Sequence, residues 1–337
     1  MRKKIRVVQF GVGPIGASIA KLLRQKQGIE LSGAVDSDPE KAGRDLGEVV
    51  GAEDAPWGVT VRGDTNELLE HPADVVVHST GSRLESVAEQ LLECLRAGCC
   101  VVSTCEELAY PFRKYPELAA QIDEAAKEEG VAIVGTGVNP GYALDKLLLT
   151  LAASAQRVDF ARGVRIVDAG KRRLPLQQKI GAGLSVEEFR QKVAEGVLKH
   201  HGLPESVGMV GEGLGFELDD IYETIEPVIA ERTVCSEFLE VAAGSVAGVH
   251  QVAQGFVHGS ERVRLELQMF IGASEPADTI LLGGEPNLGL TIPGGVPGDS
   301  GTAAIVVNAI PNILAAPAGL RTVRDLPLGY LAPGARL

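Results

Sequence analysis

The sequence lacks the patterns that mark a disulfide framework, a metal cluster or a membrane span. Its 337 residues contain five cysteines, and no two of them form a C-x-x-C pair. An odd number of cysteines without framework spacing indicates reduced thiols rather than disulfides or a metal site. No apolar run approaches the roughly 18 residues of a membrane helix, and the run after the basic N-terminal residues breaks at Gly11, too early for a signal peptide. We therefore expect a cytoplasmic protein with no metal ligands.

Basic residues are too few to balance the acidic ones. The chain has 32 Lys and Arg against 45 Asp and Glu, a formal net charge of −13. This charge disfavours nucleic acid or an anionic membrane as a partner, although backbone N–H groups at a helix N-terminus can still bind a phosphate. The chain also has no G-x-S-x-G, H-E-x-x-H or Walker motif. Hydrolase and phosphotransferase functions therefore lose support, and small molecules are the expected partners.

A glycine fingerprint is present near the N-terminus. Gly11, Gly13 and Gly16 have the G-x-G-x-x-G spacing, between an apolar strand and a helix that begins at Pro14. In this motif the glycines permit a tight turn, a close approach to a pyrophosphate, and helix–strand packing. Asp36 ends the next predicted strand, where a carboxylate binds the ribose 2′-OH of NAD and repels the 2′-phosphate of NADP. We predict NAD as the cofactor, with NADP as the alternative because basic residues follow at 41 and 44.

Apolar strands alternate with helices through the first 153 residues. This pattern predicts an α/β fold, a Rossmann-type doubly wound parallel sheet covered on both faces. Strands are expected at 5–10, 30–35, 59–62, 73–78, 99–103 and 131–134, and helices at 38–46, 65–71, 82–97, 116–129 and 143–153. Ligands bind beyond the carboxyl ends of such strands. We expect the cofactor to contact Gly11, Gly13, Pro14, Ile15, Gly16, Asp36, Ser79, Thr80, Gly81, Thr104 and Asn139.

The regular alternation of strands and helices ends after about residue 154. Long alternating strands are predicted at 158–167 and 262–271, with helical segments near 186–199 and 219–226. Strands and helices that do not alternate one for one indicate an α+β domain, which we assign to residues 154–297 for substrate binding and oligomerisation, with a homodimer as the expected state. Residues 298–337 are predicted to return to the first domain. Their helix at 302–310 has Asp299 or Ser300 as its N-cap, and Pro311 must stop or kink it.

A few polar residues are candidates for chemistry by position alone. Glu106 and Glu107 follow a strand of the predicted sheet, where carboxylates either accept a proton, hold a cation, or simply begin a helix. His200 precedes a turn-like segment at 202–206, and His250 lies in a strand or turn. Both imidazoles suit proton transfer, but such residues also satisfy loop backbone. Asn139 with Pro140 is either a plain turn or a contact to ribose or substrate.

Five longer runs are more specific than the glycine fingerprint. They are Val35-Asp36-Ser37-Asp38 with Lys41 and Gly43, residues 103–111 (STCEELAYP), residues 137–141 (GVNPG), His200 with residues 202–206 (GLPES), and residues 246–251 (VAGVHQ). Together they resemble the 2,4-diaminopentanoate dehydrogenases. These belong with the dihydrodipicolinate reductase-like proteins, and the native amine dehydrogenases are close relatives. The resemblance covers nearly the whole chain.

The resemblance implies NAD(P)-dependent oxidative deamination of an amine or diamine, or reductive amination of a ketone with ammonia. It places a catalytic glutamate after the strand at 99–103, which aligns with Glu107, and Glu106 is the close competitor. The carboxylate would bind ammonium or iminium and move a proton. Asn139, with Pro140, and His200 align with substrate-pocket positions, and His250 is a weaker correspondence.

The chain departs from other relatives at these positions. Dihydrodipicolinate reductase follows its His-His pair with a Lys and an Asp-Ala-Pro-Ser-Gly-Thr run, whereas Gly-Leu-Pro-Glu-Ser follows here. An inositol-type dehydrogenase would have Glu-Lys-Pro where this chain has Glu-Glu-Leu, which counts against alcohol oxidation. The alternatives that stay open are a related imine or alcohol oxidoreductase and a nucleotide-binding sensor without turnover.

Overall fold

The chain divides into two compact units. The computed structural model describes residues 4–65 and 73–334, and the units comprise residues 1–142 with 297–337, and residues 143–296. The first division therefore falls after Tyr142 rather than after residue 153. The reason is that α6 (Lys146–Ala152) packs against a helix and a strand of the second unit.

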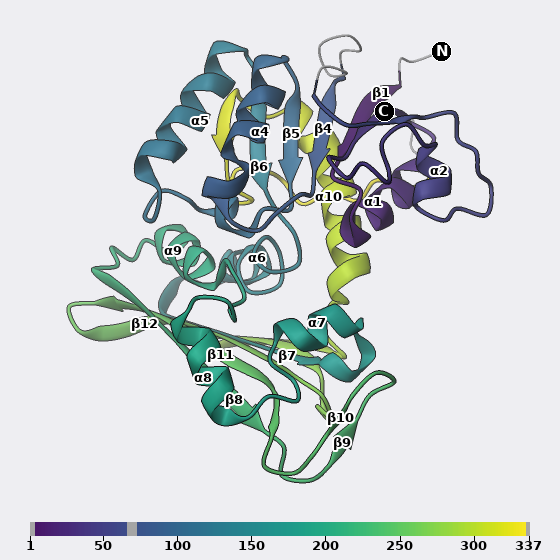
Figure 1. Ribbon diagram of the computed structural model, residues 1–337. Coiled ribbons are helices and arrows are strands. Elements are labelled where there is room, and N and C mark those ends of the chain that lie inside the picture. Colours follow the sequence, from purple (N-terminus) through teal and green to yellow (C-terminus); the bar gives the residue numbers. More distant parts are fainter. Residues whose placement is uncertain (1–3, 66–72, 335–337) are drawn as a thin grey trace. The chain divides into compact units, whose positions relative to one another are not determined.

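The first unit is built on a seven-stranded parallel sheet, which confirms the predicted Rossmann-type architecture (Figure 1). In spatial order the strands are β15 (Gly319–Arg321), β6 (Ala132–Gly135), β5 (Cys100–Ser103), β4 (Val75–His78), β1 (Ile5–Phe10), β2 (Ile29–Val35) and β3 (Val61–Arg62). The strand order reverses direction between β1 and β4. In doubly wound sheets this switch point forms the ligand-binding crevice.

Helices cover both faces of this sheet. On one face α4 (Leu84–Arg96) packs against α5 (Pro116–Glu128), and on the other α1 (Pro14–Arg24) packs against α10 (Gly298–Leu314) (Figure 1). Because both faces are covered, β4, β5 and β6 are buried along their whole length. This double burial explains why the strands are continuously apolar in the sequence. A short 3₁₀ helix, η1 (Glu106–Ala109), follows β5.

Two local predictions in the first unit are wrong: the helix at 38–46 and the N-cap of the helix at 302–310. Residues 39–43 form turns, and the short helix α2 (Leu46–Val49) begins where the predicted helix ends. The carboxylates of Asp36 and Asp38 accept hydrogen bonds from backbone N–H groups two residues on, and such Asx turns compete with helix formation. At the other end of the chain, α10 begins at Gly298 with Pro297 as N-cap and continues past Pro311. The helix predicted at 65–71 lies outside the described residues apart from its first residue.

The second unit contains a six-stranded mixed sheet, as an α+β domain should. In spatial order its strands are β14 (Leu288–Pro293), β13 (Ala277–Glu285), β7 (Arg157–Asp168), β12 (Ser260–Phe270), β11 (Val246–Val257) and β8 (Asp220–Ile229). Strands β7 and β12 run parallel and the other neighbours run antiparallel. A two-stranded ribbon, β9 (Val234–Cys235) with β10 (Glu240–Val241), and a 3₁₀ turn, η2 (Ala169–Lys171), complete the unit.

Strand β8 replaces the helix predicted at 219–226. Exposure alternates along it with period two, and it pairs with β11 along its length at the edge of the sheet. An edge strand tolerates Pro227, and its Ile, Thr and Tyr residues favour extended structure. Pairing with a strand distant in the sequence therefore determines the secondary structure of a segment whose own sequence is ambiguous.

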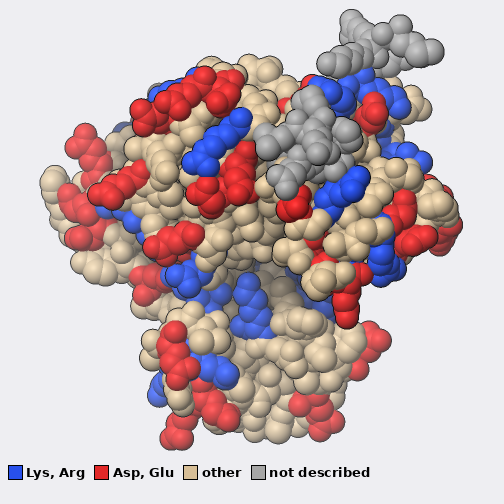
Figure 2. Space-filling model, turned by 45° about the horizontal axis from the view of Figure 1, so that its top comes forward, with Lys and Arg blue, Asp and Glu red and all other residues tan. Residues whose placement is uncertain are grey.

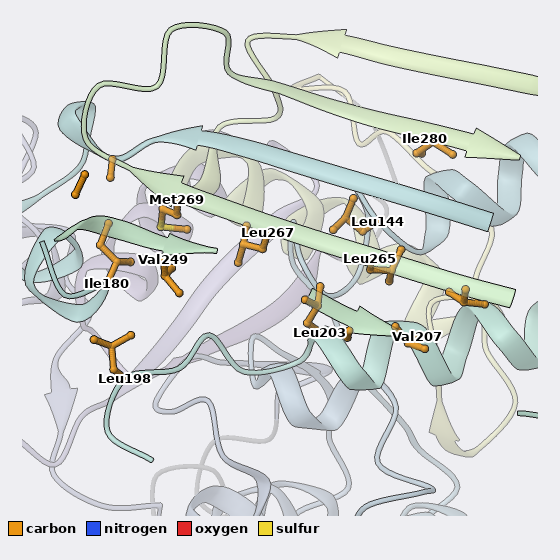
Figure 3. Packing of buried hydrophobic residues seen from close by; sticks show 14 of the residues in the cluster. Leu144, Ile180, Leu198, Leu203, Val207, Val249, Leu265, Leu267, Met269 and Ile280 are labelled. Carbon is orange, nitrogen blue, oxygen red and sulfur yellow. The ribbon is translucent and has the colours of Figure 1, made fainter. Parts of the chain in front are cut away.

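Helices cover one face of this second sheet. They are α6, α7 (Leu174–Lys179), α8 (Val186–Ala194) and α9 (Leu203–Gly213). The core between them and the sheet is aliphatic, with Leu203 and Val207 of α9 packed toward Leu265 and Leu267 of β12 (Figure 3). The segment predicted as a turn at 202–206 instead begins α9, because Gly202 adopts a left-handed conformation and Pro204 fits the first helical turn.

The visible surface mixes charges of both signs. Acidic side chains are spread over the face shown, with Lys and Arg between them (Figure 2). Across residues 4–65 and 73–334, no helix is both long enough and apolar enough to cross a membrane.

Candidate active site

The carboxyl ends of four central strands stand in one row. Phe10 of β1 pairs with His78 of β4, His78 pairs with Ser103 of β5, and Ser103 pairs with Gly135 of β6. The residues that follow these strands therefore emerge along a single edge at the switch point. This edge carries the predicted cofactor residues after β1, β4, β5 and β6.

The three fingerprint glycines have different surroundings. A Cβ on Gly11, which has φ +87°, would lie 2.7 Å from the Ser79 carbonyl oxygen. A Cβ on Gly16 would lie 1.9 Å from the Gly11 carbonyl oxygen. Both glycines are thus demanded by the packing of the loop itself. A Cβ on Gly13 would meet nothing within 4 Å, so that open space at the start of α1 fits a group from outside the chain.

The start of α1 can hold a phosphate. Gly13 is the N-cap and has no side chain that could cap the helix, and Pro14 occupies the first turn. Helix geometry leaves the N–H groups of Ile15 and Gly16 without intrahelical acceptors, and the helix dipole favours an anion there. The loop therefore fits the pyrophosphate of a dinucleotide.

Asp36 is tied to the glycine loop. Its Oδ2 accepts hydrogen bonds from the backbone N–H of Val12 (2.6 Å) and from Lys41 Nζ (3.1 Å), and its Oδ1 accepts one from the N–H of Asp38 (2.9 Å). Burial raises the pKa of Asp36, but these hydrogen bonds more than offset burial, so the pKa lies below its usual value. The carboxylate is therefore charged at neutral pH, and it lies directly after β2, hydrogen-bonded to the glycine loop.

The two glutamates after β5 have different surroundings. Glu107 is 1% exposed. Its Oε2 accepts hydrogen bonds from the N–H of Leu84 (2.8 Å) and from the hydroxyl of Tyr115 (3.0 Å), and its Oε1 pairs with Lys114 Nζ at 2.6 Å. Glu106, one residue earlier, is only partly buried. Glu107 thus joins the start of α4 to the segment before α5, whereas Glu106 lies at the surface of the turn.

Asn139 has a buried side-chain amide at the carboxyl edge of the first sheet. Both the oxygen and the nitrogen of its side-chain amide are buried, and neither has a hydrogen-bond partner among the described residues. Its loop is tightly folded, since a Cβ on Gly141 would lie 2.3 Å from the Gly137 nitrogen. A buried amide without partners costs free energy, so this side chain is suited to a cofactor or substrate group.

The second unit positions His200 through a glutamine. Gln251 is fully buried; its Oε1 accepts a hydrogen bond from the N–H of His200 (3.2 Å), and its Nε2 donates to the carbonyl of His200 (2.8 Å) and to Glu223 (2.8 Å). Burial, with the nearby charges of Lys179 and Arg165, lowers the pKa of His200 to about 3. Its buried Nδ1 has no partner among the described residues. His200 is therefore a neutral imidazole available for a hydrogen bond.

His250 has different neighbours from His200 and Gln251. It lies on β11 next to Gln251, and successive side chains of a strand point to opposite faces of the sheet. Its Nε2 lies 3.0 Å from Glu266 on the neighbouring strand. Sequence reasoning missed Gln251, although it ends the quoted run at 246–251. Only the parity of the strand distinguishes the two residues.

The cysteines show no sign of a metal site. All five are free thiols, and four of them are buried. Burial raises the pKa of Cys105 to about 12, which makes this thiol a poor nucleophile or ligand. Within the described ranges no group of three or more His, Cys, Asp or Glu residues is arranged to hold a metal ion.

Both units match known protein families. Residues 142–333 match the family model described as the 2,4-diaminopentanoate dehydrogenase C-terminal domain, and residues 5–135 match the N-terminus of dihydrodipicolinate reductase. The chain is 32% identical to the 2,4-diaminopentanoate dehydrogenase of Acetoanaerobium sticklandii, covering 97% of this chain and 94% of that one. It is 27% identical to an amine dehydrogenase of Streptomyces virginiae, covering 96% of each.

A solved structure agrees along the whole chain. The amine dehydrogenase of Mycobacterium smegmatis has a TM-score of 0.86 with this chain, with 29% sequence identity and 99% of both chains covered. The agreement therefore extends over both units and includes the segments that carry the candidate residues.

Proposed function

Because the chain belongs to the 2,4-diaminopentanoate dehydrogenase family, we propose that it interconverts an amine and a ketone by NAD(P)-dependent oxidative deamination and reductive amination. It is an oxidoreductase that acts on CH–NH2 groups. The observation that carries this proposal is the 32% identity to a 2,4-diaminopentanoate dehydrogenase over 97% of the chain. A match of that extent includes both the cofactor-binding unit and the second unit.

The residues of the first unit suit this chemistry. The loop at Gly13 and the start of α1 would hold the pyrophosphate, and Asp36 would hold the adenosine ribose. NAD(P) held there would supply or accept the hydride of the reaction. Asn139, whose two amide atoms have no partner in the part of the chain that the structure describes, would orient the nicotinamide ribose or the substrate. His200 would offer a neutral hydrogen-bonding group to the substrate.

We propose Glu106 as the carboxylate that faces the reacting nitrogen and Glu107 as the residue that positions it. The iminium formed on hydride loss is cationic, so a carboxylate beside it lowers the barrier and can take a proton from the attacking or leaving nitrogen. Glu107 is supported for the positioning role by its burial and its bonds to Leu84, Lys114 and Tyr115. Glu106 is the carboxylate of the pair with solvent access.

Ammonia dependence tests the reaction class. Purified protein should consume NADH with a panel of ketones and keto acids only when ammonium is present, and it should form NADH from the corresponding amines. Consumption without ammonium would favour an alcohol oxidoreductase. Reduction of preformed cyclic imines without use of free ammonium would favour an imine reductase. Cofactor binding with no turnover of amines, diamines or hydroxy acids would leave a nucleotide-binding sensor.

We propose NAD rather than NADP as the preferred cofactor, on the basis of the charged Asp36. Replacing Asp36 by Asn should raise the ratio of kcat/KM for NADP to that for NAD by about 10- to 100-fold, because a charged hydrogen bond to ribose is weakened and repulsion of the 2′-phosphate is removed. Lys41, which pairs with Asp36 and Asp38, would then be available to the phosphate. Asp38→Asn is the matched control, since it also pairs with Lys41 but is more exposed. An unchanged ratio in Asp36→Asn would show that this carboxylate does not face the 2′ position.

We propose that the chain forms a homodimer through the second sheet. The four helices α6–α9 pack on the other face of this sheet. By strand register Leu281 (49% exposed) and Phe160 (39%) lie on the open face on the neighbouring strands β13 and β7. Tyr222 (57%) lies on the same face on the edge strand β8, with Arg162, Arg264 and Gln254 between it and Leu281. Exposed apolar side chains on an uncovered sheet face favour self-association. Leu281→Asp should convert the dimer to a monomer in light scattering after size exclusion. Val197→Asp, an exposed apolar position away from the sheet, should leave the dimer intact; a monomeric unmodified protein would contradict the proposal.

We also propose a cytoplasmic location. Five free thiols, four of them buried, suit a reducing compartment. Cell fractionation that recovers the protein outside the cytoplasm would contradict this location.

A further inference from the structure

A buried histidine lies beneath the cofactor edge and takes no part in the chemistry proposed above. His78 is the last residue of β4 and is fully buried. The ring of Phe10, at the end of β1, meets it edge-on with centroids 5.4 Å apart. Both strands flank the switch point, so His78 stands directly below the residues that are expected to contact the cofactor.

The Nδ1 side of the ring reaches the turn that carries the two glutamates. His78 Nδ1 lies 2.9 Å from Ser103 Oγ, and Ser103 Oγ accepts a hydrogen bond from the N–H of Cys105 at 3.1 Å. Ser103 is the register partner of His78 at the end of β5. A single hydroxyl therefore connects the imidazole to the backbone immediately before Glu106.

The Nε2 side of the ring reaches the turn after β4. His78 Nε2 lies 2.9 Å from Thr80 Oγ1 and 3.0 Å from Gln90 Oε1 of α4. The Thr80 hydroxyl donates to the same Gln90 oxygen at 2.6 Å. Because the Thr80 proton goes to Gln90, Thr80 Oγ1 can only accept from the ring. Nε2 must therefore carry the proton.

One protonation state satisfies the whole network. With the proton on Nε2, Nδ1 accepts from the Ser103 hydroxyl, and Ser103 Oγ accepts from Cys105. Burial lowers the pKa of His78 to about 4, although the Gln90 hydrogen bond acts in the opposite direction. The ring is thus neutral at neutral pH, and each hydrogen bond of the network keeps the same donor and acceptor.

A second set of hydrogen bonds serves the glycine loop instead. Ser79 Oγ donates to the carbonyl of Gly11 at 2.9 Å, and Gln9 Nε2 donates to that same carbonyl and to Ser79 Oγ, both at 2.9 Å. The end of β4 is thus hydrogen-bonded to the glycine loop through Ser79, and to the turn that carries Glu106 and Glu107 through His78 and Ser103. These two connections use different side chains and can be removed separately.

We propose that His78 is a positioning residue that, through Ser103, fixes the turn carrying Glu106. This proposal rests on the proposed function in that it assigns the turn a part in the reaction. Losing the hydrogen bond between His78 and Ser103 should displace the Glu106 carboxylate, while the glycine loop, held by Ser79, keeps its place. The rate at saturating substrates should fall, and cofactor affinity should not.

Three variants separate positioning from general structure. In His78→Asn the amide lies near the position of Nδ1 and can keep the hydrogen bond to Ser103. In His78→Gln the amide lies near the position of Nε2 and can keep the hydrogen bonds to Thr80 and Gln90. Ser103→Ala and His78→Gln should each lower kcat for reductive amination by about 10- to 100-fold, the range that a displacement near 1 Å produces. His78→Asn should retain kcat within a few-fold. The Kd for NADH, from fluorescence titration, should stay within about three-fold in all three variants.

Hydrogen exchange gives a readout that does not need turnover. In Ser103→Ala, amide exchange should increase in the peptide covering residues 104–107 and stay unchanged in the peptide covering 11–16. If the unmodified protein does not aminate ketones, this measurement still tests the connection through Ser103, so failure of the proposed function is distinguished from failure of the inference. If His78→Gln does not fold, Ser103→Ala still tests the proposal, because it removes only one oxygen atom.

Several results would overturn the proposal. Unchanged kcat and unchanged exchange in Ser103→Ala would show that this connection positions nothing. Equal losses in His78→Asn and His78→Gln, or a parallel loss of NADH affinity in both, would show that His78 serves the general structure of the sheet. Ser79→Ala is the comparison variant, and it should weaken NADH binding more than it lowers kcat.

Discussion

Glu106→Gln should lower kcat for reductive amination by about 10²- to 10⁴-fold, the usual contribution of a positioned general acid–base group. The substituted amide keeps the size of the side chain but has neither the charge that stabilises a cationic iminium nor a proton site. Thermal stability should change little, since Glu106 is only partly buried. Rates measured at saturating ketone, ammonium and NADH, together with the Kd for NADH, check this expectation.

The matched comparison is Glu107→Gln. Glutamine can still accept from the N–H of Leu84 but loses the ion pair with Lys114, whose side chain is 46% exposed. We expect a loss of stability of about 1–3 kcal/mol from the disturbed buried hydrogen bonds, with a smaller fall in kcat than in Glu106→Gln. If instead Glu107→Gln folds normally and loses most of its rate while Glu106→Gln keeps it, the assignment drawn from the family alignment is right and the roles proposed here are reversed.

Asp278→Asn should reduce the free energy of unfolding of the second unit by about 3–5 kcal/mol, because it leaves a buried guanidinium without its counter-charge. Arg165 and Asp278 are 4% and 2% exposed on neighbouring strands. Arg165 Nη1 lies 2.6 and 2.5 Å from the two carboxylate oxygens, and Nη2 donates to the carbonyl of Val296 at 2.6 Å. Burial lowers the pKa of Arg165, so the guanidinium depends on this carboxylate.

The pair also holds the last residue of the second unit. Asp278 Oδ2 accepts a hydrogen bond from the N–H of Val296 at 2.7 Å, so both backbone groups of Val296 are bound by the ion pair. Urea unfolding followed by circular dichroism measures the loss. Asp159→Asn is the control, because Asp159 pairs with Arg157 at 2.9 Å on the surface and exposed pairs contribute little to stability. Equal effects of the two substitutions would show that the buried pair is not stabilising its strands.

Much of the first unit could be predicted from the sequence because its signals are local. A strand, a glycine turn and a helix follow one another within residues 5–24, and each glycine contributes through neighbours in that same segment or in the adjacent turn. Continuous apolar strands are equally easy to predict, since a sheet covered on both faces buries every residue of its central strands. The family likewise follows from contiguous runs of sequence. These features need no knowledge of distant partners.

The second unit was harder to predict because its structure depends on pairing. Strand β8 and helix α9 were mistaken for a helix and a turn, since the first is decided by its register with β11 and the second by Gly202. His250 and Gln251 are adjacent in the sequence, yet only Gln251 faces His200. Strand parity cannot be assigned until the strand is placed in its sheet.

The sequence by itself determined the dinucleotide fold, the family and the short list of polar residues at the strand ends. Only the tertiary structure decided their surroundings: Glu107 is buried and accepts hydrogen bonds from Leu84, Lys114 and Tyr115, the Asn139 amide has no partner among the described residues, and His78 is joined to Ser103. The physical reason is that burial and hydrogen bonding are set by residues brought together from distant parts of the chain. Local sequence specifies which groups are present, and packing specifies which of them remain available for chemistry.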